Sequence, residues 1–199
     1  MAAPQAPRTR LSAPERREQL LDVTTALVLE RSFHEVSIDA VAKHAGITRA
    51  VVYQHFDDLA ALFDAVVERA LDRAREQARA AAPDLGGDAH TAMLASVEAY
   101  VGAVIDDPDT WRLVLMQPDG APETVRKKIA DGRNQLLAAM TADVRPVFAA
   151  SDDPELTASA LSVLANNYAH LALADPEQYS SARLLRHADW MIRGFLDRG

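Results

Sequence analysis

Apolar residues recur along most of the chain at the three- and four-residue spacing that places them on one face of an α-helix. No stretch alternates apolar and polar residues over the length of a strand. Alanine, the best helix former, supplies 38 of the 199 residues, whereas glycine supplies only 8. The pattern predicts an all-α fold. Its clearest stripe is Leu59, Leu62, Phe63, Val66, Val67, Ala70, Leu71 and Ala74.

Composition excludes several classes of protein. No apolar run approaches the roughly 18–20 residues of a membrane-spanning helix, and the first residues lack the apolar segment of a secretory signal. The absence of cysteine excludes disulfides and thiolate chemistry, which fits a cytoplasmic protein. The chain also lacks a Gly-rich phosphate loop, a Gly-x-Ser-x-Gly turn and a His-Glu-x-x-His motif. We therefore expect no enzyme activity, no cofactor and no metal.

The charge is unevenly distributed. The chain carries a net charge of −8, which by itself argues against nucleic-acid binding. Residues 1–56, however, hold 7 basic and 6 acidic residues, a net of +1, and residues 57–199 hold 14 and 23, a net of −9. The distribution is compatible with a DNA-facing head on an acidic body.

Capping and turn signals divide the chain into four parts. Residues 1–11 show no periodicity and are predicted to be a flexible tail. Residues 12–58 are predicted to hold three helices, and residues 59–82 one long connecting helix. Residues 83–199 follow a Pro- and Gly-rich break and are predicted to add five helices, which makes nine. Bends are predicted at Gly132 and Pro146.

Two short helices, predicted at residues 38–44 and 48–56, have the layout of a helix-turn-helix motif. Gly46 between them supplies the left-handed backbone that the tight turn needs. In such a motif the second helix enters the major groove of DNA. The outward positions of this helix are Thr48, Arg49, Ala50, Tyr53 and Gln54.

Residues 17–63 resemble the DNA-binding domain of the TetR family of bacterial one-component regulators. The similarity rests on SIDAVAKHAGIT at residues 37–48, on VYQHF at residues 52–56 and on Leu-Phe at residues 62–63. The length and the nine-helix layout are also similar. The resemblance implies a helix-turn-helix head and a helical body for ligand binding and dimerisation.

The resemblance also implies roles for single residues. Arg49 matches a base-reading position, and Ser37, Thr48, Tyr53 and His55 match positions that contact phosphates. Arginine at a base-reading position suits bidentate contact with guanine. A helix-capping role for His55 stays open, and Lys43 reaches either a phosphate or solvent. The candidate DNA-binding residues are Ser37, Lys43, Thr48, Arg49, Ala50, Tyr53, Gln54 and His55.

The chain departs from the family pattern at three places. Residues 50–51 are Ala-Val where the family often has Gly-Thr or Gly-Ser, and Gln54 replaces a second tyrosine. Leu59 replaces a lysine that anchors a phosphate. Together with the acidic residues 57–58, the loss of this lysine predicts weaker nonspecific binding, while Gln54 adds a candidate reader of adenine.

The body domain shows no motif, but soft and polar-tipped side chains interrupt its apolar helices. Aromatic rings, methionines and a few polar groups are typical of small-molecule cavities, although each such residue also fits an ordinary core. The candidate ligand-binding residues are Met93, Tyr100, Trp111, Met116, Met140, Phe148, Asn167, Tyr168 and His170.

The last two predicted helices, at residues 156–174 and 181–197, are apolar on more than one face, which indicates a second partner. Two such helices from each chain of a twofold dimer would form a four-helix interface, and the resemblance implies the same. The candidate dimerisation residues are Leu161, Leu164, Leu184, Ala188, Met191 and Phe195.

These predictions combine into a ligand-responsive repressor. It would bind a palindromic operator in double-stranded DNA as a homodimer, and an apolar or aromatic small molecule would release it. The alternative is an interaction protein that keeps the helix-turn-helix fold without sequence-specific DNA binding.

Overall fold

The computed structural model describes residues 11–116 and 120–196, and these ranges fold into nine α-helices and two 3-10 turns with no strand. The predicted all-α architecture is confirmed, while the predicted tail up to residue 10 lies outside the described residues. The helices are α1 (Ala13–Arg31), α2 (Ile38–Ala45), α3 (Arg49–Tyr53), α4 (Leu59–Ala80), α5 (Ala89–Asp106), α6 (Pro108–Leu115), α7 (Glu123–Val144), α8 (Pro154–Ala174) and α9 (Ser181–Leu196).

Local capping explains where the helices of the head begin and end. The Ser12 hydroxyl accepts from the backbone N–H of Glu15, and the Glu15 carboxylate accepts from the Ser12 N–H at 2.8 Å, so α1 opens with a complete capping box. Ser37 caps α2 in a similar way. Gly46 ends α2 with φ 66° and ψ 36°, the left-handed conformation that the sequence predicts. Helix α3 is shorter than predicted, because the chain turns immediately after Tyr53.

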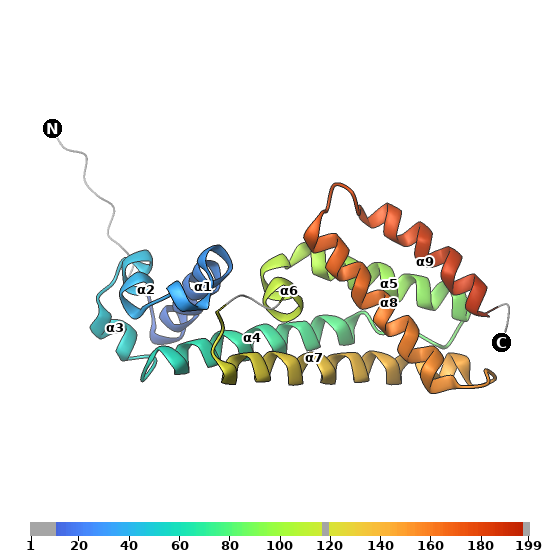
Figure 1. Cartoon of the computed structure of the whole chain (residues 1–199), viewed down its shortest axis with the longest axis horizontal. Coiled ribbons are helices and arrows are strands. Elements are labelled where there is room, and N and C mark those ends of the chain that lie inside the picture. Colours follow the sequence, from blue (N-terminus) through green and yellow to red (C-terminus); the bar gives the residue numbers. More distant parts are fainter. Residues whose placement is uncertain (1–10, 117–119, 197–199) are drawn as a thin grey trace.

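Helix α4 is the long connection between the head and the body (Figure 1). Its 22 residues span about 33 Å at about 1.5 Å per residue. At the head end, Phe63 of α4 packs edge-on against Phe33, with ring centroids 4.9 Å apart. One cluster of buried apolar side chains runs from the head along α4 into α6, α7 and α8 without a gap.

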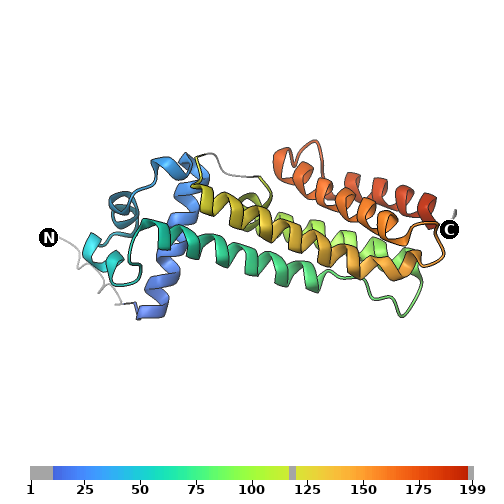
Figure 2. The same cartoon turned by 60° about the horizontal axis from the view of Figure 1, so that its bottom comes forward.

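The body consists of α7 beside α4, with α5, α8 and α9 at the end away from the head (Figures 1 and 2). Helices α4 and α7 lie side by side and run in the same direction. Helix α6 packs against both α4 and α1, so it contacts the body and the head. No helix in the described ranges combines the length and the apolar character that a bilayer crossing requires.

Gly132, a predicted bend of α7, lies against Leu71 of α4. The helix continues through it to Val144. A Cβ atom at Gly132 would lie 2.4 Å from Cδ2 and 2.7 Å from Cδ1 of the buried Leu71 on α4. The glycine therefore serves close packing. Pro146, the other predicted bend, lies in the 3-10 turn that follows α7.

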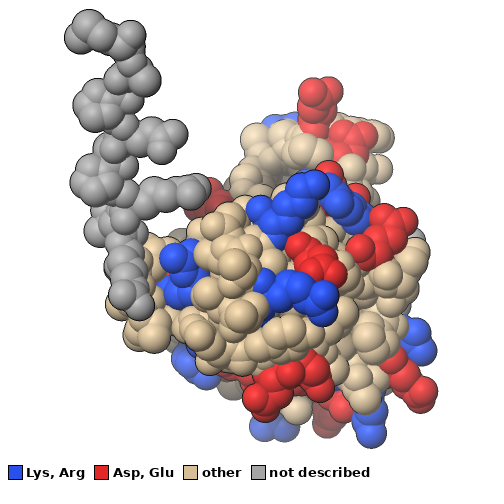
Figure 3. Space-filling model, turned by 90° about the vertical axis from the view of Figure 1, so that its left-hand side faces the viewer, with Lys and Arg blue, Asp and Glu red and all other residues tan. Residues whose placement is uncertain are grey.

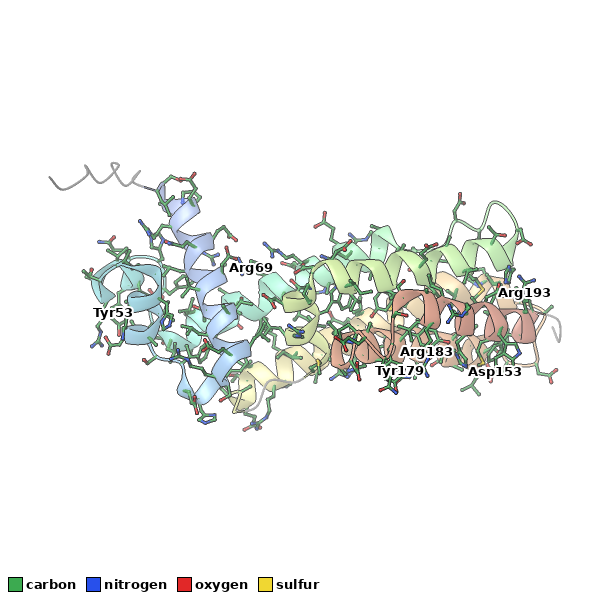
Figure 4. All side chains as sticks on the ribbon, turned by 90° about the horizontal axis from the view of Figure 1, so that it is seen from above. Tyr53, Arg69, Asp153, Tyr179, Arg183 and Arg193 are labelled. Carbon is green, nitrogen blue, oxygen red and sulfur yellow. The ribbon has the colours of Figure 1, made fainter. Side chains whose placement is uncertain are left out.

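Two charged side chains link neighbouring helices to α4. Arg69 of α4 donates to Glu18 at 2.9 Å and to Asp22 at 2.7 Å, both on α1, and its side chain is only 15% exposed (Figure 4). Lys128 of α7 contacts Asp64 and Glu68 of α4. Because both cations are largely covered, these pairs are screened less than ordinary surface pairs.

We predict that Gly132→Ala destabilises the protein by about 1–3 kcal/mol, because the added methyl overlaps Leu71 in a packed interface. Gly102→Ala in α5 is the control, since a Cβ there meets nothing within 4 Å; it should stabilise by about 0.5–1 kcal/mol through helix propensity. Urea denaturation measures both. Equal effects of the two substitutions would contradict close packing at Gly132.

Candidate nucleic-acid interface and body cavity

Helix α3 lies at one extreme of the elongated molecule, with Tyr53 at its tip (Figures 1 and 4). Val52 on its inner side is fully buried, and Ala42 and Ala45 of α2 are covered as well. The structure brings the predicted DNA-binding residues onto the surface of this end of the chain. Seven of the eight are exposed and only His55 is half-buried. Such an arrangement leaves the outer face of α3 open to the major groove.

Arg49 is held in place by two neighbours on the exposed face. Its Nε lies 3.2 Å from Oδ1 of Asp39 on α2. A hydrogen bond with the side chain of Tyr53 and the charge of Asp39 raise the pKa of Arg49 above its usual value. The guanidinium thus stays charged and points away from the core, as bidentate recognition of a base requires.

The hydroxyl groups of the head differ in what they already bind. The Ser37 oxygen accepts from the Ala40 N–H at 3.2 Å, so it is engaged in capping α2. Thr48, at the start of α3, makes no side-chain capping hydrogen bond. It is therefore freer than Ser37 to contact a phosphate. Lys43 is exposed at the end of α2.

The structure gives physical reasons for Leu59, one of the departures from the family pattern, and for the acidic Asp58 that precedes it. Leu59 is half-buried and packs against the main core, where a lysine would lose apolar contact. Asp58 caps α4, with Oδ1 accepting from the Ala61 N–H at 2.7 Å. The end of the molecule that carries α2 and α3 shows separate basic and acidic patches rather than a continuous basic surface (Figure 3). This agrees with the near-zero charge of the head sequence.

The body contains a small, mostly apolar cavity of about 60 Å³. It lies between the carboxyl end of α4 and helices α5, α7, α8 and α9. A cavity of this size holds a few water molecules, at roughly 10–15 Å³ each. It is far smaller than the about 300–1,000 Å³ of a typical ligand site. A drug-sized ligand would have to widen it.

Four of the nine predicted ligand residues line this cavity: Met93, Tyr100, Met140 and Tyr168. The other five do not line it, and their ligand-binding role stays a prediction. Trp111 is fully buried behind Tyr100, and Phe148 is buried in the turn after α7. Met116 is 43% exposed at the end of α6. Asn167 faces outward and His170 is half-buried outside the cavity wall.

The predicted dimerisation residues also lie mainly inside the single chain. Leu161, Leu164, Ala188 and Met191 line the cavity. Leu184 is buried, and Phe195 packs against the same cluster. A side chain already covered within the chain adds little buried area in a dimer, and this applies to Leu161, Leu184 and Ala188, whereas Leu164, Met191 and Phe195 are half-buried. The role of the six in dimerisation stays a prediction.

Sequence reasoning missed several residues of the cavity wall. Ser96, Ser162 and Asp143 contribute polar groups, and residues 81–83 after α4 close one side. Alanine and serine within apolar helices give no signal of their own, because they fit any helix interface. The sequence predicts Asp143 to be an ordinary exposed residue of α7. Only the arrangement of the helices places it at the cavity.

Comparison with known proteins supports the predicted resemblance of the head to TetR-family regulators. Residues 20–66 match the family model for "Bacterial regulatory proteins, tetR family". The chain is 32% identical over 106 residues to the HTH-type transcriptional activator FasR of Mycolicibacterium smegmatis, a match that covers 53% of this chain and 48% of FasR. It is 35% identical over 63 residues to the HTH-type transcriptional repressor BepR of Brucella suis, covering 32% of this chain and 30% of BepR. The chain thus spans less than half the length of either relative.

Solved structures extend the similarity to the body. A TetR-like transcriptional regulator from Rhodococcus sp. RHA1 superposes with a TM-score of 0.69 at 25% identity, over 93% of this chain and 98% of that one. The fatty acid degradation regulator FadR of Bacillus halodurans shares the fold, with a TM-score of 0.69 at 13% identity, over 92% of this chain and 96% of that one.

Residues 20–66 thus match a model of the TetR family, and the chain shares its fold with a TetR-like regulator. The proteins that it matches are transcriptional regulators and not enzymes, in agreement with the absence of catalytic motifs from the sequence. FasR and BepR are named as an activator and a repressor, so the comparisons leave the direction of regulation open.

We predict that Arg49→Ala relaxes specificity at one base pair of each half-site, at a cost of about 1–3 kcal/mol in discrimination. Tyr53→Phe, which removes only a hydroxyl group, should weaken binding more evenly across sequences. Arg112→Ala is the control, because Arg112 is an equally charged, exposed residue of α6. Binding-site selection from random duplexes measures all three. An unchanged selected sequence for Arg49→Ala would contradict the base-reading role.

Proposed function

We propose that this protein is a transcriptional repressor that binds a palindromic operator as a homodimer and is released by a small molecule. The observation that carries the proposal is that α4 connects the two sites. Its amino end, starting at Leu59, packs against α1 in the head, and its carboxyl end, around residues 78–83, lines the cavity. A ligand that widens the cavity therefore pushes on the helix that orients the head.

A second route from the cavity to α4 runs through the neighbouring side chains. The ring of Tyr100, in the cavity wall, packs edge-on against Trp111 of α6 at 5.1 Å between centroids. The Trp111 Nε1–H donates to Oε1 of Gln77 on α4 at 2.6 Å. Gln77 in turn donates to Asp107 at 2.9 Å. Movement of Tyr100 is thus transmitted to α4 and to α6, which also packs against α1.

The outward faces of α8 and α9 are the proposed dimer interface. The exposed stripe of α8 is apolar or small at all positions but one: Leu156, Ala160, Val163, Asn167 and Ala174. Trp190 of α9 is 68% exposed. Its ring lies 5.7 Å from that of His187, which in turn packs against Tyr168 of α8, so the two exposed faces adjoin. Regulators of this family are usually dimers, and a self-complementary patch is what a twofold dimer needs.

DNA and effector would oppose each other by linkage. In the dimer the two α3 helices must lie about 34–36 Å apart to read successive major grooves on one side of the duplex. A ligand that stabilises another spacing of the two helices reduces the population able to bind DNA. Operator binding in turn lowers the affinity for the ligand by the same factor. The proposed effector site is the cavity, lined by Met93, Tyr100, Met140 and Tyr168 among others.

The alternative is an interaction protein without sequence-specific DNA binding. Leu59 and the acidic residues 57–58 support this alternative. Fluorescence anisotropy separates the two functions. The purified protein is titrated against a labelled duplex from its own upstream intergenic region and against a scrambled duplex, at two salt concentrations. A tight and salt-dependent preference for the native duplex supports the repressor, and a regulated site elsewhere is then sought by genomic selection. If neither experiment finds a sequence preference, the result supports the alternative.

We predict that Val163→Glu converts the dimer to a monomer and lowers operator affinity, because it buries an unpaired charge at the proposed interface. Val163 is 50% exposed. Ile105→Glu in α5 is the control, since Ile105 is a similar aliphatic residue at 44% exposure outside α8 and α9. Size-exclusion chromatography with light scattering gives the mass of each variant. A dimeric Val163→Glu variant would contradict the interface.

A further inference from the structure

The described wall of the cavity contains a single charged side chain, and it is a carboxylate. Asp143, in the last turn of α7, lines the cavity and is also exposed, so it lies at the opening. No lysine, arginine or histidine among the residues that the structure describes lines the cavity. The rest of the wall is aliphatic or aromatic apart from the hydroxyl groups of Ser96, Ser162 and the two tyrosines.

The end of α4 adds to the negative character of the opening. This 22-residue helix ends at Ala80, and residues 81–83, which follow it, line the cavity. The carboxyl end of a helix carries a partial negative charge, which favours a cation nearby. The nearest basic residues in sequence, Arg79 and Arg145, are exposed and do not belong to the wall.

The polar groups deep in the cavity wall already have partners within the protein. The Tyr100 hydroxyl donates to Oδ1 of Asn166 at 3.4 Å, and the Tyr168 hydroxyl lies 2.7 Å from Nδ1 of His187. Burial raises the pKa of both phenols, so both stay neutral. The Ser162 hydroxyl donates to the Ala158 carbonyl at 2.9 Å. The interior therefore offers apolar contacts and aromatic faces rather than free hydrogen-bonding groups.

The charge of Arg133 on α7 partly offsets the rise in the pKa of Tyr100 that burial causes. This arginine is half-buried but does not line the cavity. An anionic headgroup would meet no basic side chain in the described wall of the cavity. At the opening, the same headgroup would face Asp143. Like charges at such a distance repel, and the repulsion is only partly screened where the wall is apolar.

We propose that the effector is an organic cation with an apolar body. The body occupies the cavity, and a quaternary or protonated amine lies at the opening beside Asp143 and the end of α4. This inference rests on the proposed function and deepens it by assigning the chemical class of the ligand. Aromatic walls also suit such a cation, because ring faces attract ammonium groups. Since the cavity is only about 60 Å³, the ligand must separate α4 from α5 or α8 to enter.

Three probes with the same alkyl chain and different headgroups test the proposal: octyltrimethylammonium, octanol and octanoate. Isothermal titration calorimetry of the full-length protein measures their dissociation constants below micelle-forming concentrations. We expect octyltrimethylammonium to bind at least about tenfold more tightly than octanoate, the ratio that about 1.4 kcal/mol produces. The dissociation constant of octanol should lie between those of the other two probes, because octanol makes the apolar contacts without a charge.

Asp143→Asn identifies the source of the preference. The substitution should weaken the binding of octyltrimethylammonium about five- to tenfold and leave the binding of octanol unchanged, because it removes only the charge at the opening. Asp131→Asn is the matched control, since Asp131 is an exposed carboxylate on α7 outside the cavity wall. Ala165→Leu, which fills the cavity, should weaken the binding of all three probes. Thermal unfolding checks that this variant is folded.

The proposal is overturned if octanoate binds as tightly as octyltrimethylammonium, if the preference for the cation survives in Asp143→Asn, or if the cation does not bind. Operator titrations without any ligand are recorded in parallel. Operator binding that persists in these cases leaves the proposed DNA-binding function intact and rejects only the ligand class. Cation binding without operator binding would reject the proposed function and retain the cavity assignment.

Discussion

The structure depends on the packing of α4 as one uninterrupted helix against α1, α6 and α7. At Gly132 no side chain separates α7 from Leu71 of α4. Arg69 links α4 to α1 and Lys128 links it to α7, both on the head side of this contact. Because the buried cluster continues through α4 from the head into the body, the two parts share one core. Neither end of α4 can move freely without disturbing the other.

This packing gives a physical basis for communication between two sites at opposite ends of a helix. At one end the helix packs against α1 of the head, and α1 contacts α2, which in turn contacts α3 with its exposed Arg49 and Tyr53. At the other end it contributes small residues to a cavity that is too small for a typical ligand. Close-packed interiors respond to inserted volume by shifting whole elements rather than by local compression. In the proposed function, a ligand in the cavity therefore acts on the direction of α4.

The sequence predicted local structure well and tertiary contacts poorly. The left-handed Gly46 follows from the chemistry of one residue and its neighbours and is confirmed, and the capping box at Ser12 has the same local origin. The residues of α8 and α9 show the limit. Their periodicity indicates two apolar faces, but Leu161 and Ala188 face the cavity while Val163 and Trp190 face outward. Which face meets which neighbour depends on helix packing, which one sequence does not encode locally. The packing role of Gly132 was missed for the same reason, since its partner lies 61 positions away in the chain.

The central claim is that ligand binding at the cavity reorients the head through α4. Because the chain has no cysteine of its own, Glu30→Cys in the exposed last turn of α1 provides a single spin-label site for pulsed distance measurement across the dimer. A tilt of about 10° over the roughly 33 Å of α4 moves each head by about 6 Å. The account predicts that octyltrimethylammonium shifts the mean distance by several ångströms, away from the value seen with operator bound. An unchanged distance with the ligand bound would contradict it.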